Sequence, residues 1–416
     1  MRLRLTIVVS VVALLFAMAP AALAGSPAAA ARAYIVTVQP DAELDGMLAG
    51  LSGRLAFAPT HVYRRALRGF AATLSANQVA ALRTDPAVRT IVADQPVAAL
   101  AQTLPTGIDR IQADGSSTRA GNGSGTVGGP AVAVIDTGID LDHPDLNVAG
   151  GVNCSSGRSF DDGNGHGTHV AGTIGAKDNT SGVVGVAPGV PLYAVRVLNN
   201  RGSGSLSGII CGVDWVTANA ASKNIKVANM SLGGSGSQGS CADGGLRQAI
   251  CESTAAGVTY VVAAGNDNAD FAAQVPATYP EVLTVTAMAD FDGQPGGGVA
   301  ATCRSDVDDT AADFSNYATT AEDIDHAIAG PGVCISSSWK GGGYKTISGT
   351  SMASPHVAGA AALCLSSGTC SGTPAQVIDK LQADAAAQPA SYGFTGDARS
   401  ASGGRHYGYL VYAGGY

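Results

Sequence analysis

The chain is 416 residues long, enough for two or three domains and a large core. Charged residues make up only 13% of it, and the formal net charge is −8. Residues 25–100 hold seven arginines against five acidic residues, whereas residues 101–416 hold 15 basic against 27 acidic residues. The acidic balance of the second part argues against nucleic-acid binding, and the opposite net charges favour association of the two parts.

The first residues are predicted to be an export signal. Arg2 and Arg4 precede an apolar run over residues 5–19, which is too short for a typical membrane span, and the Ala-Leu-Ala sequence at 22–24 has the small–x–small pattern of a cleavage site. We therefore expect residues 1–24 to be removed and the remainder to be secreted into the extracellular space. No later apolar run reaches membrane length, so we expect no membrane association.

The pattern of residues 33–100 predicts a small α+β unit. Strands are expected at 34–38, 70–74 and 88–92, and helices at 41–51 and 79–83. Ser75 and Gln78 have the spacing of a capping box in front of the second helix. Taken alone, this unit could be a free-standing binding module.

Beyond residue 108, apolar strands alternate with helices. Residues 115–130 are expected to form a flexible loop. The alternation predicts an α/β fold with a doubly wound, mostly parallel sheet flanked by helices. The expected strands are 131–135, 192–197, 226–231, 258–263, 282–287 and a closing strand at 409–412, and the expected helices are 166–176, 205–221, 243–256 and 351–366.

All eight cysteines lie after residue 101, and an even number in an exported chain favours disulfide bonds. Cys241–Cys251 and Cys364–Cys370 are short-range candidate pairs. Cys303–Cys334 would restrain the Gly- and Asp-rich stretch 290–313, and Cys154–Cys211 is the pair that remains. Sequence alone leaves the connectivity open.

Three segments far apart in the chain carry the groups of a nucleophilic hydrolase. Ser351, in Gly-Thr-Ser-Met-Ala-Ser-Pro-His at 349–356, opens a small-residue helical run whose first backbone N–H groups could stabilise an oxyanion. His166 enters another helix, and Asp136 ends an apolar strand. A serine nucleophile needs a base such as imidazole, and the imidazole needs a carboxylate that fixes its tautomer.

Each of these residues also has a simpler interpretation. Asp136 could be an ordinary turn former, and His169 and His356 are expected to be packed helix residues. His166 and His169 have the spacing of a metal pair, but no cysteine or carboxylate cluster completes a zinc site. Asn266, in Ala-Ala-Gly-Asn at 263–266, could simply accept a left-handed turn conformation.

With these motifs, residues 101–416 resemble the subtilisin family of secreted serine proteases, near the subtilisin and proteinase K branches. The resemblance makes Asp136, His166 and Ser351 a catalytic triad, and it places the oxyanion hole at the Asn266 side chain and the Ser351 backbone. It implies a monomeric endopeptidase that accepts extended polypeptides with broad specificity and prefers apolar P1 and P4 groups. The implied substrate-binding residues are Leu206, Ser231, Leu232, Gly233 and Gly265.

Two other functions share parts of this pattern. A catalytically inactive binding protein with the same fold is disfavoured because the triad is intact. An esterase or amidase acting on small molecules is disfavoured by the strand-like motif at 229–234, which suits extended peptides.

Residues 25–100 resemble, less strongly, the inhibitor propeptide of subtilisins, a ferredoxin-like α+β domain that assists folding and then inhibits the protease. Residues 101–108 resemble the mature amino terminus of the family. The resemblance therefore implies self-processing after about Leu100, with residues 25–100 as an intramolecular inhibitor and residues 101–416 as the peptidase domain.

A structural calcium ion is also implied by the resemblance, because residues 176–183 match the length of the loop at the strong calcium site of subtilisins. Calcium prefers oxygen ligands, many of them backbone carbonyls, although a plain surface loop is the alternative. The implied ligands are the side chains of Gln102, Asp145 and Asn179 and the carbonyls of Lys177, Ser181 and Val183. A second ion could bind near four aspartates that we expect to form a solvated acidic loop: Asp306, Asp308, Asp309 and Asp313.

Overall fold

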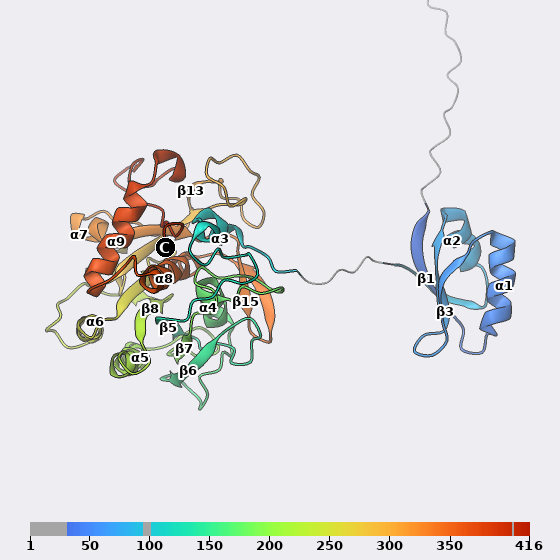
Figure 1. Cartoon of the computed structure of the whole chain (residues 1–416), viewed down its shortest axis with the longest axis horizontal. Coiled ribbons are helices and arrows are strands. Elements are labelled where there is room, and N and C mark those ends of the chain that lie inside the picture. The colour runs from blue at the N-terminus through green and yellow to red at the C-terminus, as the bar shows by residue number, and fades with distance from the viewer. Residues whose placement is uncertain (1–30, 95–100, 402) are drawn as a thin grey trace, which may run out of the picture. The chain divides into compact units, whose positions relative to one another are not determined.

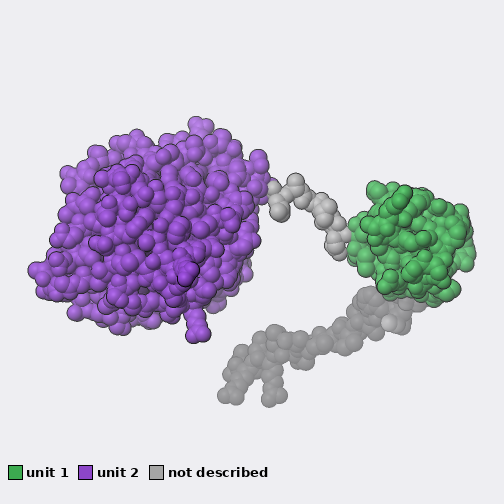
Figure 2. All heavy atoms as spheres, turned by 90° about the horizontal axis from the view of Figure 1, so that it is seen from below, with its two compact units in different colours: residues 1–99 green, residues 100–416 purple. Residues whose placement is uncertain are grey.

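The computed structural model describes residues 31–94, 101–401 and 403–416. The chain forms two compact units, residues 1–99 and 100–416 (Figure 2). The predicted export signal at 1–24 and the predicted cut after Leu100 lie outside the described residues. Among the helices of the described ranges, none is long and apolar enough to cross a membrane.

The first unit is a four-stranded antiparallel sheet with two helices (Figure 1). The strand order β2–β3–β1–β4 and the chain order βαββαβ give the ferredoxin-like α+β arrangement that the resemblance implied. Leu48, Phe70 and Leu82 are buried in its small core. The elements are β1 (Arg32–Val38), α1 (Leu44–Leu55), β2 (Pro59–Tyr63), β3 (Gly69–Leu74), α2 (Ala76–Arg83) and β4 (Val88–Ala93).

Side-chain caps decide where the two helices of this unit begin. The predicted capping box is confirmed, since Ser75 Oγ accepts from Gln78 N at 3.3 Å and Gln78 Oε1 accepts from Ser75 N at 2.7 Å. The Glu43 carboxylate accepts the first free N–H groups of α1. For this reason α1 begins at Leu44, three residues later than predicted.

The second unit is built on an eight-stranded sheet with the order β13–β12–β10–β8–β5–β7–β6, in which β14 also pairs with β12. The pairs from β6 across to β14 are parallel, and only the short β13 is antiparallel among the described strands of this sheet. The strands are β5 (Ala131–Asp136), β6 (Val148–Asn153), β7 (Leu192–Arg196), β8 (Ile225–Met230), β10 (Thr259–Ala263), β12 (Leu283–Ala289), β13 (Thr310–Ala311) and β14 (Ala327–Pro331).

Helices cover both faces of this sheet, so its strands are apolar on both sides. Val132 and Val134 of β5 face a core shared with α4 (His166–Gly175), α8 (Thr350–Ser367) and α9 (Pro374–Ala387). Ala133 and Ile135 face the opposite core with α5 (Leu206–Asn219) and α6 (Leu246–Ala255). The predicted doubly wound α/β fold is therefore confirmed (Figure 1).

Some elements differ from the prediction. The closing strand predicted at 409–412 is wrong, because this described segment pairs only through a single bridge between Leu410 and Ala329. The helix predicted at 243–256 begins at Leu246, after two glycines with positive φ. The sequence did not predict β2, β6, β13, β14, α9, α3 (Thr106–Arg110), β9 (Gly234–Ser235), β11 (Gln274–Val275), α7 (Ala321–Asp325) or the hairpin of β15 (Ile335–Trp339) and β16 (Gly343–Ile347).

The eight cysteines form four disulfide bonds, which pair as the sequence favoured: Cys154–Cys211, Cys241–Cys251, Cys303–Cys334 and Cys364–Cys370. The first joins the segment after β6 to α5, and the third ties Cys303, inside the Gly- and Asp-rich stretch, to Cys334 between β14 and β15.

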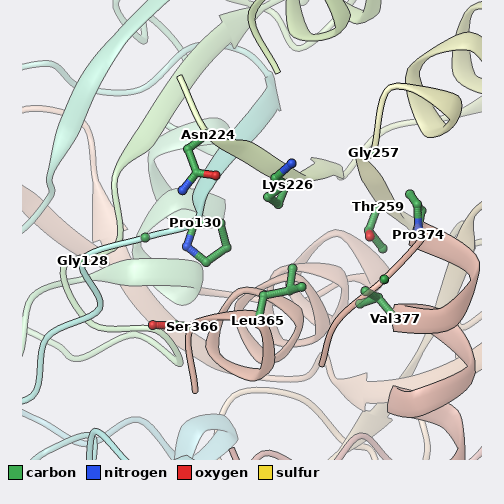
Figure 3. Close-up of a pocket in the computed structure, with 12 residues that line it drawn as sticks. Gly128, Pro130, Asn224, Lys226, Gly257, Thr259, Leu365, Ser366, Pro374 and Val377 are labelled. Atoms are coloured by element: carbon green, nitrogen blue, oxygen red, sulfur yellow. The ribbon is translucent and has the colours of Figure 1, made fainter. Parts of the chain in front are cut away.

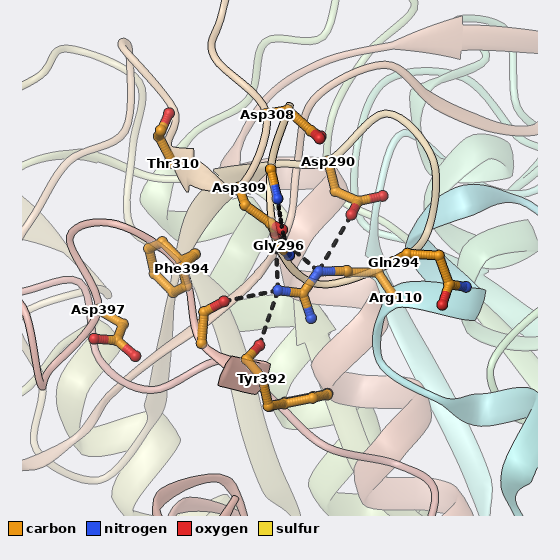
Figure 4. A network of polar contacts seen from close by, with 12 residues as sticks. Arg110, Asp290, Gln294, Gly296, Asp308, Asp309, Thr310, Tyr392, Phe394 and Asp397 are labelled. Carbon is orange, nitrogen blue, oxygen red and sulfur yellow. Dashed lines mark hydrogen bonds and ion pairs between the residues drawn. The ribbon is translucent and has the colours of Figure 1, made fainter. Parts of the chain in front are cut away.

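A buried arginine joins three segments that are distant in sequence (Figure 4). Arg110, at the end of α3, is fully buried, and its Nε and Nη2 lie 2.9 and 2.8 Å from Asp309 Oδ1. Nη2 also donates to the carbonyl oxygens of Tyr392 and Gly393, and Nε lies 3.2 Å from Asp290 Oδ2. The guanidinium thereby fastens the first helix of this unit to its acidic loop and to its C-terminal segment.

We expect Arg110→Ala to lower the free energy of unfolding of this unit by about 3–5 kcal/mol, because it leaves two buried carboxylates without their cation. Lys380→Ala removes a partly exposed ion pair with Asp384 and should cost about 1 kcal/mol or less. Urea unfolding followed by circular dichroism measures both. Equal losses in the two variants would contradict the anchoring role of Arg110.

Candidate active site

Three of the predicted residues stand where secondary-structure elements begin or end. Asp136 is the last residue of β5, His166 is the first of α4, and Ser351 lies in the first turn of α8. Because the neighbouring strands are parallel, their carboxyl ends meet at one edge of the sheet, where functional groups of α/β folds gather.

The structure brings Asp136 and His166 into direct contact. His166 Nδ1 lies 2.8 Å from Asp136 Oδ1, which also accepts from Thr137 N at 2.7 Å. The carboxylate is fully buried, whereas the imidazole is 26% exposed. Asp136 Oδ2 has no hydrogen-bond partner among the described residues. The contact fixes the imidazole with its Nδ1 towards the carboxylate and leaves Nε2 for another partner.

Burial and charge act in opposite directions on His166. Burial lowers the pKa of the imidazole, but the charge and hydrogen bond of Asp136, with the charge of Asp162, more than offset this and raise the pKa above its ordinary value. The site therefore favours an imidazolium more than water does.

Ser351 and Ser231 are joined by two reciprocal hydrogen bonds. Ser351 Oγ donates to the Ser231 carbonyl at 3.1 Å, and Ser231 Oγ donates to the Ser351 carbonyl at 2.8 Å. In this arrangement the Ser351 hydroxyl is directed to Ser231, and a rotation about the side-chain torsion is needed before it can donate to His166.

Two N–H donors converge beside Ser351. Asn266 Oδ1 accepts from Thr350 N at 2.8 Å and from Thr350 Oγ1 at 3.0 Å, which leaves the Asn266 amide nitrogen to act as a donor. A Cβ atom built on Gly349 would lie 3.6 Å from Asn266 Nδ2 and 3.7 Å from Ser351 N, so both donors border one small space. Two N–H groups at one place could together bind an oxyanion.

The five predicted substrate-binding residues line two adjoining pockets. One, of about 550 Å³, contains Leu206, Ser231, Leu232 and Gly233 together with His166. The other, of about 230 Å³, contains Leu232, Gly233 and Gly265 together with Ser351 and Asn266. Small apolar residues form much of the second pocket: Ala263, Ala264, Val275 and Ala277.

Comparisons with protein families match segments in both units of the chain. Residues 128–405 match the Subtilase family, and residues 39–99 match the family described as Peptidase inhibitor I9. The chain belongs to the subtilase family.

Curated relatives of this subtilase are named as proteases. It is 42% identical over 291 residues to an alkaline protease of Shouchella clausii, covering 70% of this chain and 67% of that protein. It is 39% identical over 320 residues to subtilisin E of Bacillus subtilis, covering 76% and 74%. A solved structure titled as a cold adapted subtilisin-like serine proteinase matches with a TM-score of 0.56 and 33% identity, covering 74% of this chain and 97% of that one. The protein is thus a serine endopeptidase of the subtilisin type.

Larger hollows of this subtilase lie at the amino ends of the strands, away from the triad candidates. One of about 620 Å³ is bordered by Pro130, Asn224, Lys226 and Thr259 (Figure 3). Another of about 1010 Å³ is bordered by residues before β12 and β14 and by the start of α9. Volume alone would therefore have pointed to the wrong end of the sheet.

Two other histidines are internal, as predicted. His169 Nε2 lies 3.0 Å from the carbonyl oxygens of both Ile335 and Lys345, and burial lowers its pKa to about 3. Burial lowers the pKa of His356 to about 4, and its Nδ1 lies 2.9 Å from the Met352 carbonyl. Both rings are neutral at physiological pH.

The predicted calcium ligands lie together. The Gln102 amide nitrogen lies 2.9 Å from the Lys177 carbonyl oxygen and 3.5 Å from that of Val183. The Asp145 carboxylate accepts from Asn179 Nδ2 at 2.9 Å and from Val183 N at 3.1 Å. Burial raises the pKa of Asp145. Ser181 follows in the same loop and bonds to Asn179 Oδ1.

This donor set fits calcium. It consists of a buried carboxylate, backbone carbonyls and two amides, and a half-turn of either amide exchanges its nitrogen for its oxygen at the same place. Thr103 N, donating to the Gly182 carbonyl at 2.8 Å, holds the segment after Gln102 beside this loop. The sequence did not find Tyr344, whose hydroxyl lies 3.3 Å from Asp145 Oδ2.

The prediction that the four aspartates of residues 306–313 are exposed to solvent is wrong for three of them. Asp306, Asp308 and Asp309 are buried. Asp309 pairs with Arg110, Asp306 with Arg304, and Asp308 accepts from backbone N–H groups. Their charges are met inside the protein, and only Asp313 is largely exposed.

Two residues that support the site were not predicted. Thr350 orients the Asn266 amide, and its only sequence signal is its place directly before Ser351. Asp162 is a second buried carboxylate close to His166, and its signal is its place four residues before that histidine.

Proposed function

We propose that Asp136, His166 and Ser351 are the catalytic triad of this subtilase and that it hydrolyses peptide bonds of extended polypeptides. The contact of 2.8 Å between Asp136 and His166 carries the proposal, because it sets the imidazole in the tautomer that a general base requires. The two donors beside Ser351 support it, since they border the space where an oxyanion would form.

The reaction follows from these positions. His166 Nε2 takes the proton of Ser351 Oγ, which attacks the scissile carbonyl carbon, and the oxyanion accepts from Ser351 N–H and Asn266 Nδ2. His166 then gives this proton to the leaving amine, and an acyl-enzyme remains on Ser351. Water attacks the acyl carbon through the same base, releasing the acid and restoring the serine.

Substrate should lie along Ser231, Leu232 and Gly233 as an added strand, held mainly by main-chain hydrogen bonds. Small apolar residues form part of the wall of the pocket of about 230 Å³, beside Asp267 and Gln274, and would accept an apolar P1 group. Leu206, 54% exposed at the rim of the larger pocket, suits a P4 contact. Broad specificity with apolar P1 and P4 preference follows, because few side chains in these walls are charged.

We assign residues 1–24 to an export signal, 25–100 to a propeptide and 101–416 to the peptidase domain of a secreted, monomeric enzyme. The match of residues 39–99 to a peptidase-inhibitor family supports the propeptide as an intramolecular inhibitor. The residues Val-Ala-Ala-Leu at 97–100 are small or apolar, as the P1 and P4 preferences require, so cleavage is proposed after about Leu100.

Calcium would be held by the side chains of Gln102, Asp145 and Asn179 and the carbonyls of Lys177, Ser181 and Val183. The ion would supply charge that stabilises the loop and takes no part in the chemistry. Because Gln102 lies just after the proposed cut, calcium binding should be linked to maturation.

Ser351→Ala should yield a purified species that still carries residues 25–100, because the attacking hydroxyl is lost. Ser366→Ala, an exposed change near the end of the same helix, should mature normally. Amino-terminal sequencing and mass spectrometry measure both. Normal Ala101 termini on the Ser351 variant, made without other proteases, would contradict self-processing.

Asn266→Ala should lower kcat and leave KM nearly unchanged, because an oxyanion donor acts mainly in the transition state. The loss expected is the one known for the oxyanion-hole asparagine of subtilisin, about 10²–10³-fold. Steady-state kinetics on a peptide anilide gives both constants. An unchanged kcat would remove Asn266 from the mechanism.

Chelation should speed thermal inactivation of the mature enzyme, because calcium at about 1000 times its Kd stabilises the folded state by roughly 4 kcal/mol. Asp145→Asn should inactivate as fast as the chelated enzyme and not respond to chelator, whereas Asp142→Asn, an exposed change in the same turn, should behave as the parent.

Burial raises the pKa of Asp145, so protons should compete with calcium for this carboxylate at a higher pH than they would at an ordinary aspartate. As the pH is lowered, the protection by calcium should therefore be lost earlier. Equal half-lives in calcium and in chelator would refute the site.

A further inference from the structure

Asp162 is a buried carboxylate to which the proposed mechanism gives no part. It lies in the loop before α4, is 5% exposed, and accepts five hydrogen bonds from its surroundings. Its Oδ1 accepts from Thr137 Oγ1 at 2.9 Å, Asn164 N at 2.8 Å and Gly165 N at 2.8 Å, and its Oδ2 accepts from Thr168 N at 3.0 Å and Thr168 Oγ1 at 2.6 Å.

The donors come from the two segments that carry Asp136 and His166. Thr137 directly follows Asp136, and the other donors lie on both sides of His166 in sequence. Thr137 Oγ1 in turn accepts from Gly167 N at 2.9 Å, which closes the connection between the end of β5 and the start of α4. Asp162 thus ties together the two backbones whose spacing decides the Asp136–His166 contact.

Only a carboxylate matches this ring of donors. Both of its oxygens accept, whereas an asparagine would turn an NH₂ group towards N–H or O–H donors on one side. Replacing this carboxylate would therefore leave at least one of the five donors facing another donor or no acceptor.

Several charged groups lie on the segments around His166, among them the buried Arg196 of β7, which donates to the Asp161 carbonyl oxygen at 2.8 Å. Asp136 contacts His166 from β5, and the His169 ring, one turn along α4, is neutral because burial lowers its pKa to about 3. The Lys340 ammonium approaches the same loop and donates to the Gly163 carbonyl at 2.6 Å. Asp162 is therefore the second carboxylate whose charge raises the pKa of His166, after Asp136.

We propose that Asp162 is a positioning residue for the hydrolysis, which holds His166 in register with Asp136 and helps to stabilise the imidazolium that forms when Ser351 gives up its proton. It touches neither substrate nor the reacting atoms and acts through the loop and its charge. The inference rests on the proposed role of His166 as the general base.

Asp162→Asn tests both parts, with Asp161→Asn as the matched control. Asp161 is exposed, precedes Asp162 directly and undergoes the same change of charge, and its carboxylate bonds only to Leu141 N and Asp162 N among the described groups. The readouts are kcat and KM per active site, counted by titration with a serine-directed inhibitor, and the pH profile of kcat/KM.

Asp162→Asn should lower kcat about 10–100-fold with KM changed little, because a small misplacement of a catalytic group has effects of this size. Removal of the negative charge disfavours the imidazolium, so the acid limb of the profile should move to lower pH by about 0.3–1 unit. Asp161→Asn should retain kcat and shift the limb less.

Thr137→Val gives a second test if Asp162→Asn folds poorly. It removes the hydroxyl that links Asp162 to Gly167 but keeps the charge, so kcat should fall while the acid limb stays in place. The double variant should lose less than the product of the two single losses, because both changes break one network.

The proposal is overturned if Asp162→Asn keeps the parent kcat, or if its acid limb coincides with that of Asp161→Asn. A fully active Thr137→Val would also count against it. His166→Ala separates this failure from a failure of the proposed function, because an active His166→Ala would refute the base itself, and an inactive one leaves only Asp162 in question.

Discussion

The site depends on one hydrogen bond between a strand end and a helix start, that of Asp136 with His166. A buried carboxylate and an imidazole can meet only if β5 and α4 approach closely. Gly167 permits this, because a Cβ there would collide with the Gly138 carbonyl oxygen and crowd Asp136. The strand order provides the place: after β5 the chain builds β6 and β7 on one side of it and β8 on the other, and α/β sheets bind ligands where their order reverses in this way.

The same edge of the sheet supplies the other parts of the site. Ser231 directly follows β8, and Asn266 lies three residues after β10, so the residues proposed to bind substrate and the oxyanion both stand at the ends of one rigid set of parallel strands. Small residues let α8 lie against that set, and Gly349, which precedes its first turn, has no side chain that could cap Ser351 N–H. Rigid elements hold a catalytic constellation more accurately than loops do.

The sequence predicted the parts whose signal is local. Continuous apolar runs marked β5, β10 and β12, and motif spacing marked Asp136, His166 and Ser351 as candidates. It failed where the signal is a distant partner: Asp309 appeared to be a solvated acid because Arg110 is 199 positions away. The strand wrongly predicted around Leu410 shows the same limit, since that side chain is buried in the core without a ladder, and burial alone produces the same apolar pattern. Glycines 150 and 151 concealed β6.

The two internal histidines give the enzyme a built-in sensitivity to acid. In the unfolded chain both imidazoles become protonated below about pH 6.5. In the folded chain His356 stays neutral down to about pH 4 and His169 down to about pH 3. As the pH falls below about 6.5, each histidine therefore lowers the stability of the folded chain progressively, and above that pH neither has an effect. For a protease this has a particular consequence. Molecules that unfold in mild acid become substrates for molecules that are still folded. Unfolding that would be reversible in another protein therefore becomes irreversible loss by autolysis once the pH recovers.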